Sequence, residues 1–164
     1  METVREQLVK KPTEQSDKVK QYGILALSLF LAMAAVILVF SFMGGLFMIM
    51  GLLLAGIILW GGYTISGMIN IEYEYCIAGS ELSVDKIIDR RKRKTLCSFS
   101  LRGADGFYSG KKELSGVTVI SAVGEGDVYT IEYKDEKYGR TLLQFTPDER
   151  TIEMISPYLP RLSK

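Results

Sequence analysis

Histidine is absent from all 164 residues of the chain, and only two cysteines are present. Without histidine, acid–base catalysis by imidazole, His-ligated metal sites and histidine pH switches are excluded. Cys76 and Cys97 lack the spacing of a zinc or CxxC redox motif, and a cytoplasmic location would keep both thiols reduced. We therefore expect two structural cysteines, no metal and no cofactor.

Charged residues are absent from one long internal stretch. The chain carries 20 Lys and Arg against 19 Asp and Glu, yet none of them lies between Lys20 and Glu72. A bilayer core about 30 Å thick needs roughly 20 apolar residues in a helix, so the uncharged residues 21–71 are enough for two spans. The sequence predicts an integral membrane protein with soluble parts before and after this stretch.

A pair of glycines, Gly44 and Gly45, divides the uncharged stretch and is its best site for a chain reversal. We predict a transmembrane helical hairpin over residues 22–69, with helices at about 22–42 and 46–66. A secretory signal peptide is excluded, because its apolar region would be about 7 to 15 residues long and no second span would follow. Transport usually requires ionisable groups inside the spans, so the hairpin is interpreted as an anchor.

Basic residues predict the orientation of the hairpin. Lys10, Lys11, Lys18 and Lys20 precede the first span, whereas the connecting turn has no Lys or Arg. The positive-inside rule then places both termini in the cytoplasm of a multi-pass protein of the cell membrane. Residues 1–21 are expected to form a cytoplasmic tail, either loosely ordered or as a short surface helix that ends before a proline.

Gly51 and Ala55 form a small-xxx-small pair in the second span. Such residues let helices approach closely, so the pair is a candidate contact with the first span or with another subunit. The alternative is that glycine is simply common in membrane helices.

Beyond residue 70, apolar and polar residues alternate, which predicts about six short antiparallel strands in a cytoplasmic domain over residues 70–164. A glycine-containing loop is expected at 102–116, a hairpin turn at 124–127, and a C-terminal helix at 147–159 with Thr146 as its N-cap. The predicted fold is an α+β membrane protein: a two-helix hairpin followed by a small antiparallel β-barrel or sandwich capped by the C-terminal helix. The expected strands cover residues 70–78, 81–88, 91–101, 117–123, 128–134 and 140–146.

Several of these segments together resemble a known family. The opening METVREQLVKK, the two spans and the segment IEYEYCIAGSELSVDKIIDRRKRKTLCSFSL are similar to an uncharacterised family of small bacterial two-span membrane proteins. The soluble part of that family resembles pleckstrin-homology-like (PH-like) domains, so the resemblance implies a fold and a membrane location but no reaction. The matching residues are Tyr73, Tyr75, Gly79, Leu82, Ile87, Ile88 and the basic run that follows them.

That basic run, Arg90, Arg91, Lys92, Arg93 and Lys94, is the densest cluster of charge in the chain. Basic residues near the cytoplasmic leaflet attract anionic lipids, so lipid contact is one hypothesis. A solvated turn and a protein-binding surface are the alternatives. Nucleic acid is not expected, because acids and bases are equal in number beyond residue 70 and no aromatic platform surrounds the run.

No catalytic residues are expected. The neighbouring carboxylates Glu72 and Glu74 lack a nucleophilic or basic partner, and the Gly-Glu-Gly sequence at 124–126 is too short for a phosphate loop. The leading interpretation is a non-enzymatic, membrane-anchored binding or scaffold module that recruits a protein at the cytoplasmic face. The alternatives are an anionic-lipid-sensing domain that uses residues 90–94 and an accessory subunit of a larger membrane complex. The identity of a protein partner and the oligomeric state stay open.

Overall fold

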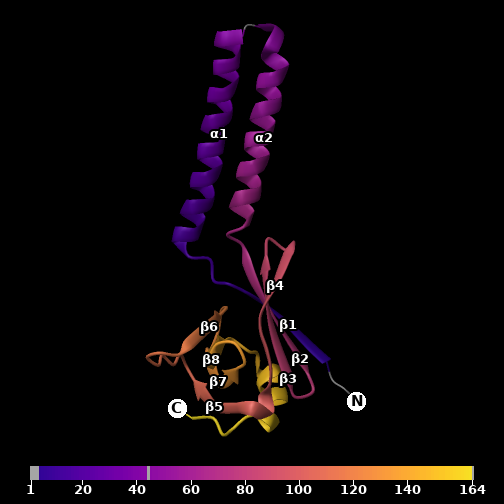
Figure 1. The fold of residues 1–164 in the computed structure, drawn as a ribbon, viewed down its shortest axis with the longest axis vertical. Helices are drawn as coiled ribbons and strands as arrows, with labels where there is room; N and C mark the ends of the chain where they lie inside the picture. Colours follow the sequence, from indigo (N-terminus) through magenta and orange to yellow (C-terminus); the bar gives the residue numbers. More distant parts are fainter. Residues whose placement is uncertain (1–3, 44, 164) are drawn as a thin grey trace. The chain divides into compact units, whose positions relative to one another are not determined.

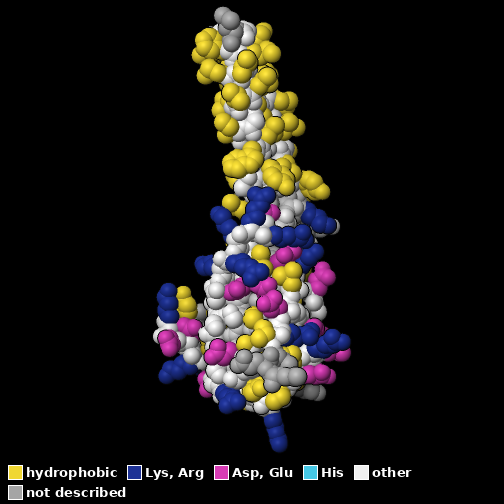
Figure 2. All heavy atoms as spheres, turned by 90° about the vertical axis from the view of Figure 1, so that its right-hand side faces the viewer, with side chains coloured by type: hydrophobic (Ala, Val, Ile, Leu, Met, Phe, Trp, Pro, Cys, Tyr) yellow, Lys and Arg dark blue, Asp and Glu magenta, His cyan; other side chains and the backbone are white. Residues whose placement is uncertain are grey.

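The computed structural model describes residues 4–43 and 45–163, which form two compact units (Figure 1). One unit, Thr13–Asn70, consists of helices. The other combines Met1–Pro12 with Ile71–Lys164 and consists mainly of two β-sheets. Apolar side chains cover the helical unit, whereas Lys, Arg, Asp and Glu side chains cover much of the sheet unit (Figure 2).

Two long helices make up the helical unit. Helix α1 (Gln15–Met43) and helix α2 (Met48–Gly67) are joined through a short 3-10 turn, Gly45–Phe47. Both helices are long and apolar enough to cross a membrane. The chain reversal lies where the sequence predicts it, although Gly44 itself lies outside the described residues. Helix α1 begins earlier than the predicted span and includes Asp17, Lys18 and Lys20.

Two glycines of α2 face α1. A Cβ atom on Gly51 would lie 3.3 Å from the Cβ of Val39, and one on Gly62 would overlap the side chain of Ser28. The Ser28 hydroxyl donates to the Leu25 carbonyl (2.8 Å), so this buried polar group is satisfied within its own helix. Gly51 therefore packs on the first helix of its own chain. Gly62, which lies four residues before the buried Ser66, makes a closer approach.

The sheet unit contains two four-stranded sheets. The first, sheet A, has the order β1-β2-β3-β4 and is antiparallel throughout; the second, sheet B, has the order β5-β7-β8-β6, with β6 parallel to β8. Helix α3 (Glu149–Ile155) and a 3-10 turn, Ser156–Tyr158, follow the last strand. The sandwich with a C-terminal helix is confirmed, and the sheets do not close into a barrel. The strands are Val4–Lys10, Ile71–Ala78, Glu81–Ile88, Lys92–Ser100, Ala104–Ser109, Thr118–Ala122, Tyr129–Asp135 and Gly139–Phe145.

A buried tyrosine links the two sheets. The Tyr75 hydroxyl on β2 donates to the carbonyl of Ala122 on β6 and accepts from the amide of Thr146 (3.1 Å). Burial raises the pKa of Tyr75 to about 12, so the phenol stays protonated and keeps both bonds at neutral pH. Alternate residues of the strands, together with one residue of α3, surround it in a common core: Tyr73, Ile77, Leu82, Val84, Ile131, Tyr133, Leu143, Phe145 and Ile155.

The prediction of a loose or helical N-terminal tail is wrong. Strand β1 pairs with β2 from Val4 opposite Ala78 to Lys10 opposite Glu72. Its inward residue Val9 is buried against Gly124, where a Cβ atom would overlap the valine. Val4, Leu8 and Val9 fit one side of a helix as a local pattern, but pairing with β2 decides the conformation.

Side chains of β1 also hold the start of α3. The amide oxygen of Gln7 accepts from the Asp148 amide (3.1 Å) and from the Thr151 hydroxyl (2.9 Å), and Arg5 pairs with Asp148. Asp148 is the N-cap of α3 and accepts from the Thr151 amide (2.7 Å). Thr146, the predicted N-cap, instead accepts from the amide of Gly124 (3.1 Å). Helix α3 consequently begins later than predicted.

Two further differences concern sheet B. The predicted loop 102–116 contains β5, and the predicted hairpin turn 124–127 does not join paired strands, because β6 pairs with β8. Strands β5 and β6 lie at opposite edges of the sheet, so residues 110–117 must cross its outer face. The side chains of Thr130 and Gln144 hold this crossing by donating to the carbonyls of Gly110 (2.7 Å) and Lys112 (3.1 Å).

Replacing Gly62 tests the helix contact. We expect Gly62→Ala to lower the stability of the helical pair by about 1–3 kcal/mol, because the added methyl overpacks against Ser28. Gly56→Ala is the matched control, since space there is open. SDS titration of the protein in bicelles, followed by the fluorescence of Trp60, measures the difference, and equal midpoints for the two variants would contradict the described packing.

Two neighbouring residues of β1 test its place in the sheet. Val9→Ala should lower the free energy of opening of β2 by about 2 kcal/mol, because it leaves a cavity beside Gly124. Leu8→Ala, on the opposite face and 55% exposed, should change it by less than about 0.5 kcal/mol. Amide hydrogen exchange of β2 in the full chain gives both values. A free tail would leave both variants at the wild-type value.

Candidate functional site

The basic run lies in the hairpin between β3 and β4. The Arg91 amide donates to the Ile88 carbonyl (3.1 Å) and closes a turn whose two central residues are Asp89 and Arg90. Both have positive φ, 51° and 53°, a conformation that glycine adopts at least cost and that a long side chain rarely takes. The chain therefore keeps a basic side chain at the tip of the hairpin where glycine would be the less strained residue.

The three arginines of the run each lie beside a carboxylate of the same sheet. Arg93 pairs with Glu74 (2.8 Å), Arg90 with Glu72 (3.4 Å) and Arg91 with Asp89 (3.5 Å). The cross-strand register places Arg93 opposite Ile87, and Ile87 opposite Glu72, so Arg93 and the glutamates share the outer face of the hairpin. The neighbouring carboxylates noted in the sequence are thus partners of arginines.

The lysines lie on the other face. Lys94 is directly opposite Lys86, and Lys92 is opposite Ile88. Lys86 is in turn opposite Tyr73, an inward-facing residue of β2, so these side chains extend the inner face of the sheet beyond the core. In the part of the chain that the structure describes, no carboxylate pairs with Lys86, Lys92 or Lys94. We call these three residues the lysine face.

Like charges directly opposite each other on a strand pair are destabilising. Lys86 and Lys94 are such a pair. The lysine face therefore carries an uncompensated positive charge, which an anion would neutralise. Sequence reasoning found Lys92 and Lys94 but missed Lys86, which lies outside the basic run. Counting residues outward from a three-residue loop, 89–91, pairs Ile88 with Lys92 and brings Lys86 opposite Lys94.

The turn lies at a defined end of sheet A. Strand β1 ends at Lys10, opposite Glu72, and β2 begins at Ile71, opposite Ile88. The Lys11 amide donates to the Ile71 carbonyl (3.1 Å) and continues this pairing. The two connections to the helices, residues 11–14 and 68–70, therefore leave sheet A at the end that carries the basic turn.

The cysteines occupy separate places in sheet A. Cys76 is half-buried on β2, and Cys97 is buried on β4. Burial raises the pKa of the Cys97 thiol to about 11, so it stays protonated and unreactive at neutral pH. Among residues 4–43 and 45–163, no cluster of three or more Cys, Asp or Glu could hold a metal ion.

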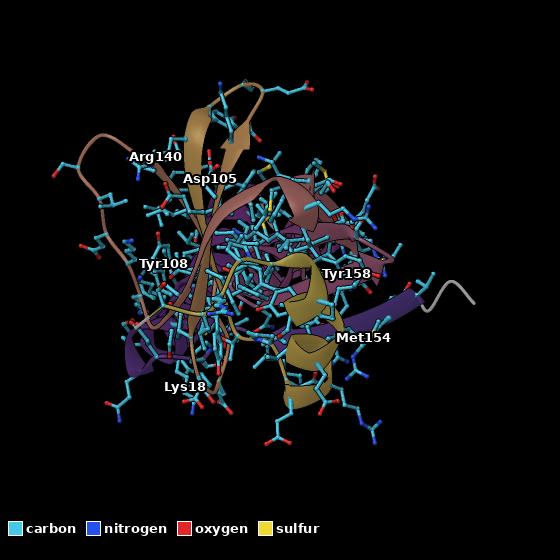
Figure 3. All side chains as sticks on the ribbon, turned by 90° about the horizontal axis from the view of Figure 1, so that it is seen from below. Lys18, Asp105, Tyr108, Arg140, Met154 and Tyr158 are labelled. Atoms are coloured by element: carbon cyan, nitrogen blue, oxygen red, sulfur yellow. The ribbon has the colours of Figure 1, made fainter. Side chains whose placement is uncertain are left out.

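A second charged cluster lies on the outer face of sheet B. Glu132, which is buried, pairs with Arg140 and accepts from the Tyr108 hydroxyl (3.3 Å). The pairing with Arg140 lowers the pKa of Glu132. Figure 3 shows Tyr108 and Arg140 on one side of sheet B, with Met154 and Tyr158 of the C-terminal segment on the other side. The charges in this cluster neutralise one another, so we interpret it as structural.

A family model agrees with the fold. The model described as "Bacterial PH-like domain (DUF6106)" matches residues 1–163, a range that includes β1, both helices and both sheets. No curated protein and no solved structure matches the chain.

Proposed function

Because this chain belongs to the family of bacterial PH-like domains, we propose that it is a non-enzymatic binding module anchored in the cell membrane, with its sheet unit at the cytoplasmic face. The observation that carries the proposal is the placement of the helices in the chain. They lie between two neighbouring strands, β1 and β2, and both connections leave the same end of sheet A. Such a chain holds its sheet unit on one side of the membrane.

The short connections support this proposal further. Residues 11–14 span at most about 14 Å when fully extended, and residues 68–70 span less. In a protein anchored by α1 and α2, the end of sheet A that carries the basic turn would therefore stay close to the lipid headgroups. The four lysines that precede the apolar part of α1 favour the cytoplasmic side for this end.

A second function, contact with anionic lipid, is favoured by the lysine face. Among residues 4–43 and 45–163, Lys86, Lys92 and Lys94 have no carboxylate partner, whereas the three arginines of the basic turn already have one. Each basic residue near an anionic leaflet contributes about 1 kcal/mol of attraction. We propose that the lysine face, more than the arginines, contacts the anionic headgroups of the leaflet in which the protein is anchored.

Labelling in intact cells tests the anchored orientation. A membrane-impermeant maleimide should modify Gly45→Cys, at the turn between the helices, without permeabilisation. It should modify Ser163→Cys only after the membrane is permeabilised. Modification of Ser163→Cys in intact cells would overturn the cytoplasmic placement of the sheet unit.

Hydrogen exchange in nanodiscs tests the lipid contact. Amides of residues 86–96 should exchange more slowly in nanodiscs that contain phosphatidylglycerol than in nanodiscs of phosphatidylcholine alone. Substituting Lys86, Lys92 and Lys94 with Gln should remove most of this difference, a loss of up to about 3 kcal/mol of attraction at low salt.

The matched control changes Arg90, Arg91 and Arg93 to Gln, which removes the same number of charges from the paired face. This variant should keep most of the protection. If the two triple variants lose the same amount of exchange protection, only the number of positive charges determines lipid contact, and the special role proposed for the lysine face is contradicted. The absence of any difference between the two lipids in the wild type would contradict lipid contact.

A further inference from the structure

The free edge of β4 borders a pocket in the sheet unit. The pocket has a volume of about 490 Å³, and it is lined by Ser98, Phe99 and Ser100 of β4 and by residues 133–138 of the β7–β8 hairpin. This volume lies within the range of about 300–1,000 Å³ that is typical of ligand sites. Because β4 is the last strand in the order of sheet A, no described strand covers its outer edge.

The backbone of β4 presents unpaired groups to this pocket. The Leu101 amide donates to the Ser80 carbonyl (2.8 Å), so Leu101 directs its N–H group toward β3. The direction alternates along an antiparallel strand, so Phe99, opposite Leu82, also faces β3. Ser98 must then direct its N–H and C=O groups to the free edge, and Ser100 its N–H group. The Ser100 carbonyl is occupied, because Ser100 is the N-cap of the 3-10 turn Leu101–Gly103. These same two serines line the pocket.

Aromatic rings form the floor of the pocket. The ring of Phe99 stacks on that of Tyr133, with centroids 3.8 Å apart and planes within 6°. Tyr133 is buried in the core, whereas Phe99 is only partly buried. The Phe99 ring is therefore held in place by the buried Tyr133 ring, and its exposed part can contact an apolar side chain of a ligand.

The wall opposite β4 is a well-defined turn. The Asp135 carboxylate accepts from the amides of Lys137 (2.8 Å) and Tyr138 (2.9 Å) and fixes the conformation of the β7–β8 turn. The Tyr138 ring is 53% exposed, and the Lys137 ammonium lies over it at 5.1 Å from the centroid. The pocket thus has a strand edge on one side and an ordered aromatic side chain on the other.

The charge along β4 defines the chemistry of the occupant. The exposed residues Lys92, Arg93 and Lys94 occupy the first part of the strand, and the pocket borders its last part. A ligand that follows the edge would pass from an aromatic site to a positively charged one. The backbone donors and acceptors at the free edge of β4 can form hydrogen bonds with another extended chain. This is how peptides bind when they add a strand to a sheet.

We propose that the free edge of β4 binds an extended, acidic peptide segment of a partner protein, which adds as a further strand to sheet A. The segment pairs with the backbone of Ser98 and Ser100, places an apolar side chain on the Phe99 ring, and carries carboxylates beside Lys92 and Lys94. This inference rests on the proposed function as a binding module, and it specifies the chemistry of the partner.

A phage-displayed library of random dodecapeptides, selected on the full-length protein in phosphatidylcholine nanodiscs, tests the proposal. This lipid is chosen because anionic lipid would compete for the lysines. Peptides that also bind empty nanodiscs are removed. The expected peptides combine an apolar or aromatic residue with acidic residues to one side of it, and their binding should slow the exchange of the Ser98 and Ser100 amides.

Ser100→Pro is the decisive variant. Ser100 has φ −83°, close to the value that proline imposes, and its amide points away from β3, so the substitution removes an edge donor and leaves the pairing with β3 intact. It should weaken peptide binding by about tenfold or more. Ser100→Ala retains the amide and should bind within about twofold of the wild type.

Tyr138→Ala provides a second variant that does not depend on the strand. Its exposed ring contributes little to the core, so the fold should be kept and peptide affinity should fall several-fold. If Ser100→Pro changes the exchange of β3 amides, and so disturbs the fold, the peptide affinity of Tyr138→Ala tests whether the peptide binds at this pocket.

Wild-type affinity in a folded Ser100→Pro protein would overturn the edge site and leave the binding module standing. Unchanged affinity in Tyr138→Ala would likewise overturn the pocket. If no peptide is enriched above empty nanodiscs, both strand addition and recruitment of a partner through a linear segment are contradicted.

Discussion

The pairing of β1 with β2 is the constraint on which the rest of the structure depends. Neighbouring antiparallel strands are usually joined by a tight turn, but here the whole of residues 11–70 lies between them. Gln7 and Arg5 of β1 also contact Asp148 and Thr151 at the start of α3. The sheet unit is therefore discontinuous in sequence. A fragment that begins at residue 70 would lack an edge strand, the buried Val9 side chain and the contacts that Arg5 and Gln7 make with the C-terminal helix.

The basic hairpin separates two kinds of cation onto its two faces. Arginine suits pairing with carboxylates through its planar group. Arg90 and Arg93 have such partners on β2, and Arg91 has one in the turn itself. Lysine is a compact charge on a flexible stem, and no described carboxylate pairs with Lys86, Lys92 or Lys94. A lipid headgroup and an acidic peptide segment would use the same ammonium groups, so anionic lipid and a bound segment would compete at this hairpin.

Much of the fold follows from the sequence. The uncharged stretch predicts the two helices, and alternation of apolar and polar residues predicts β2, β3, β4 and β7, because local patterns specify these elements. Strand β8 was also predicted, although its residues 141–145 are all buried and do not alternate. Strand β1 could not be found in this way, since its partner lies beyond the helices. The parallel pairing of β6 was also hidden, because Gly124 to Asp127 has the composition of a hairpin turn. In the candidate site, the basic run was evident, but the separation of lysines from arginines depends on cross-strand register.

The placement of the helices between β1 and β2 also has a consequence for biogenesis. The ribosome synthesises β1 first, but its pairing partner emerges only after both apolar helices have been made. In the membrane-anchored protein that we propose, the first strand would remain without its sheet while the helices enter the bilayer, and the Val9 side chain, which the folded sheet buries, would stay uncovered during this interval. In such a protein, completion of sheet A would require both helix ends to return to the same side, so an incorrectly inserted chain could not assemble the sheet and would be open to proteolysis.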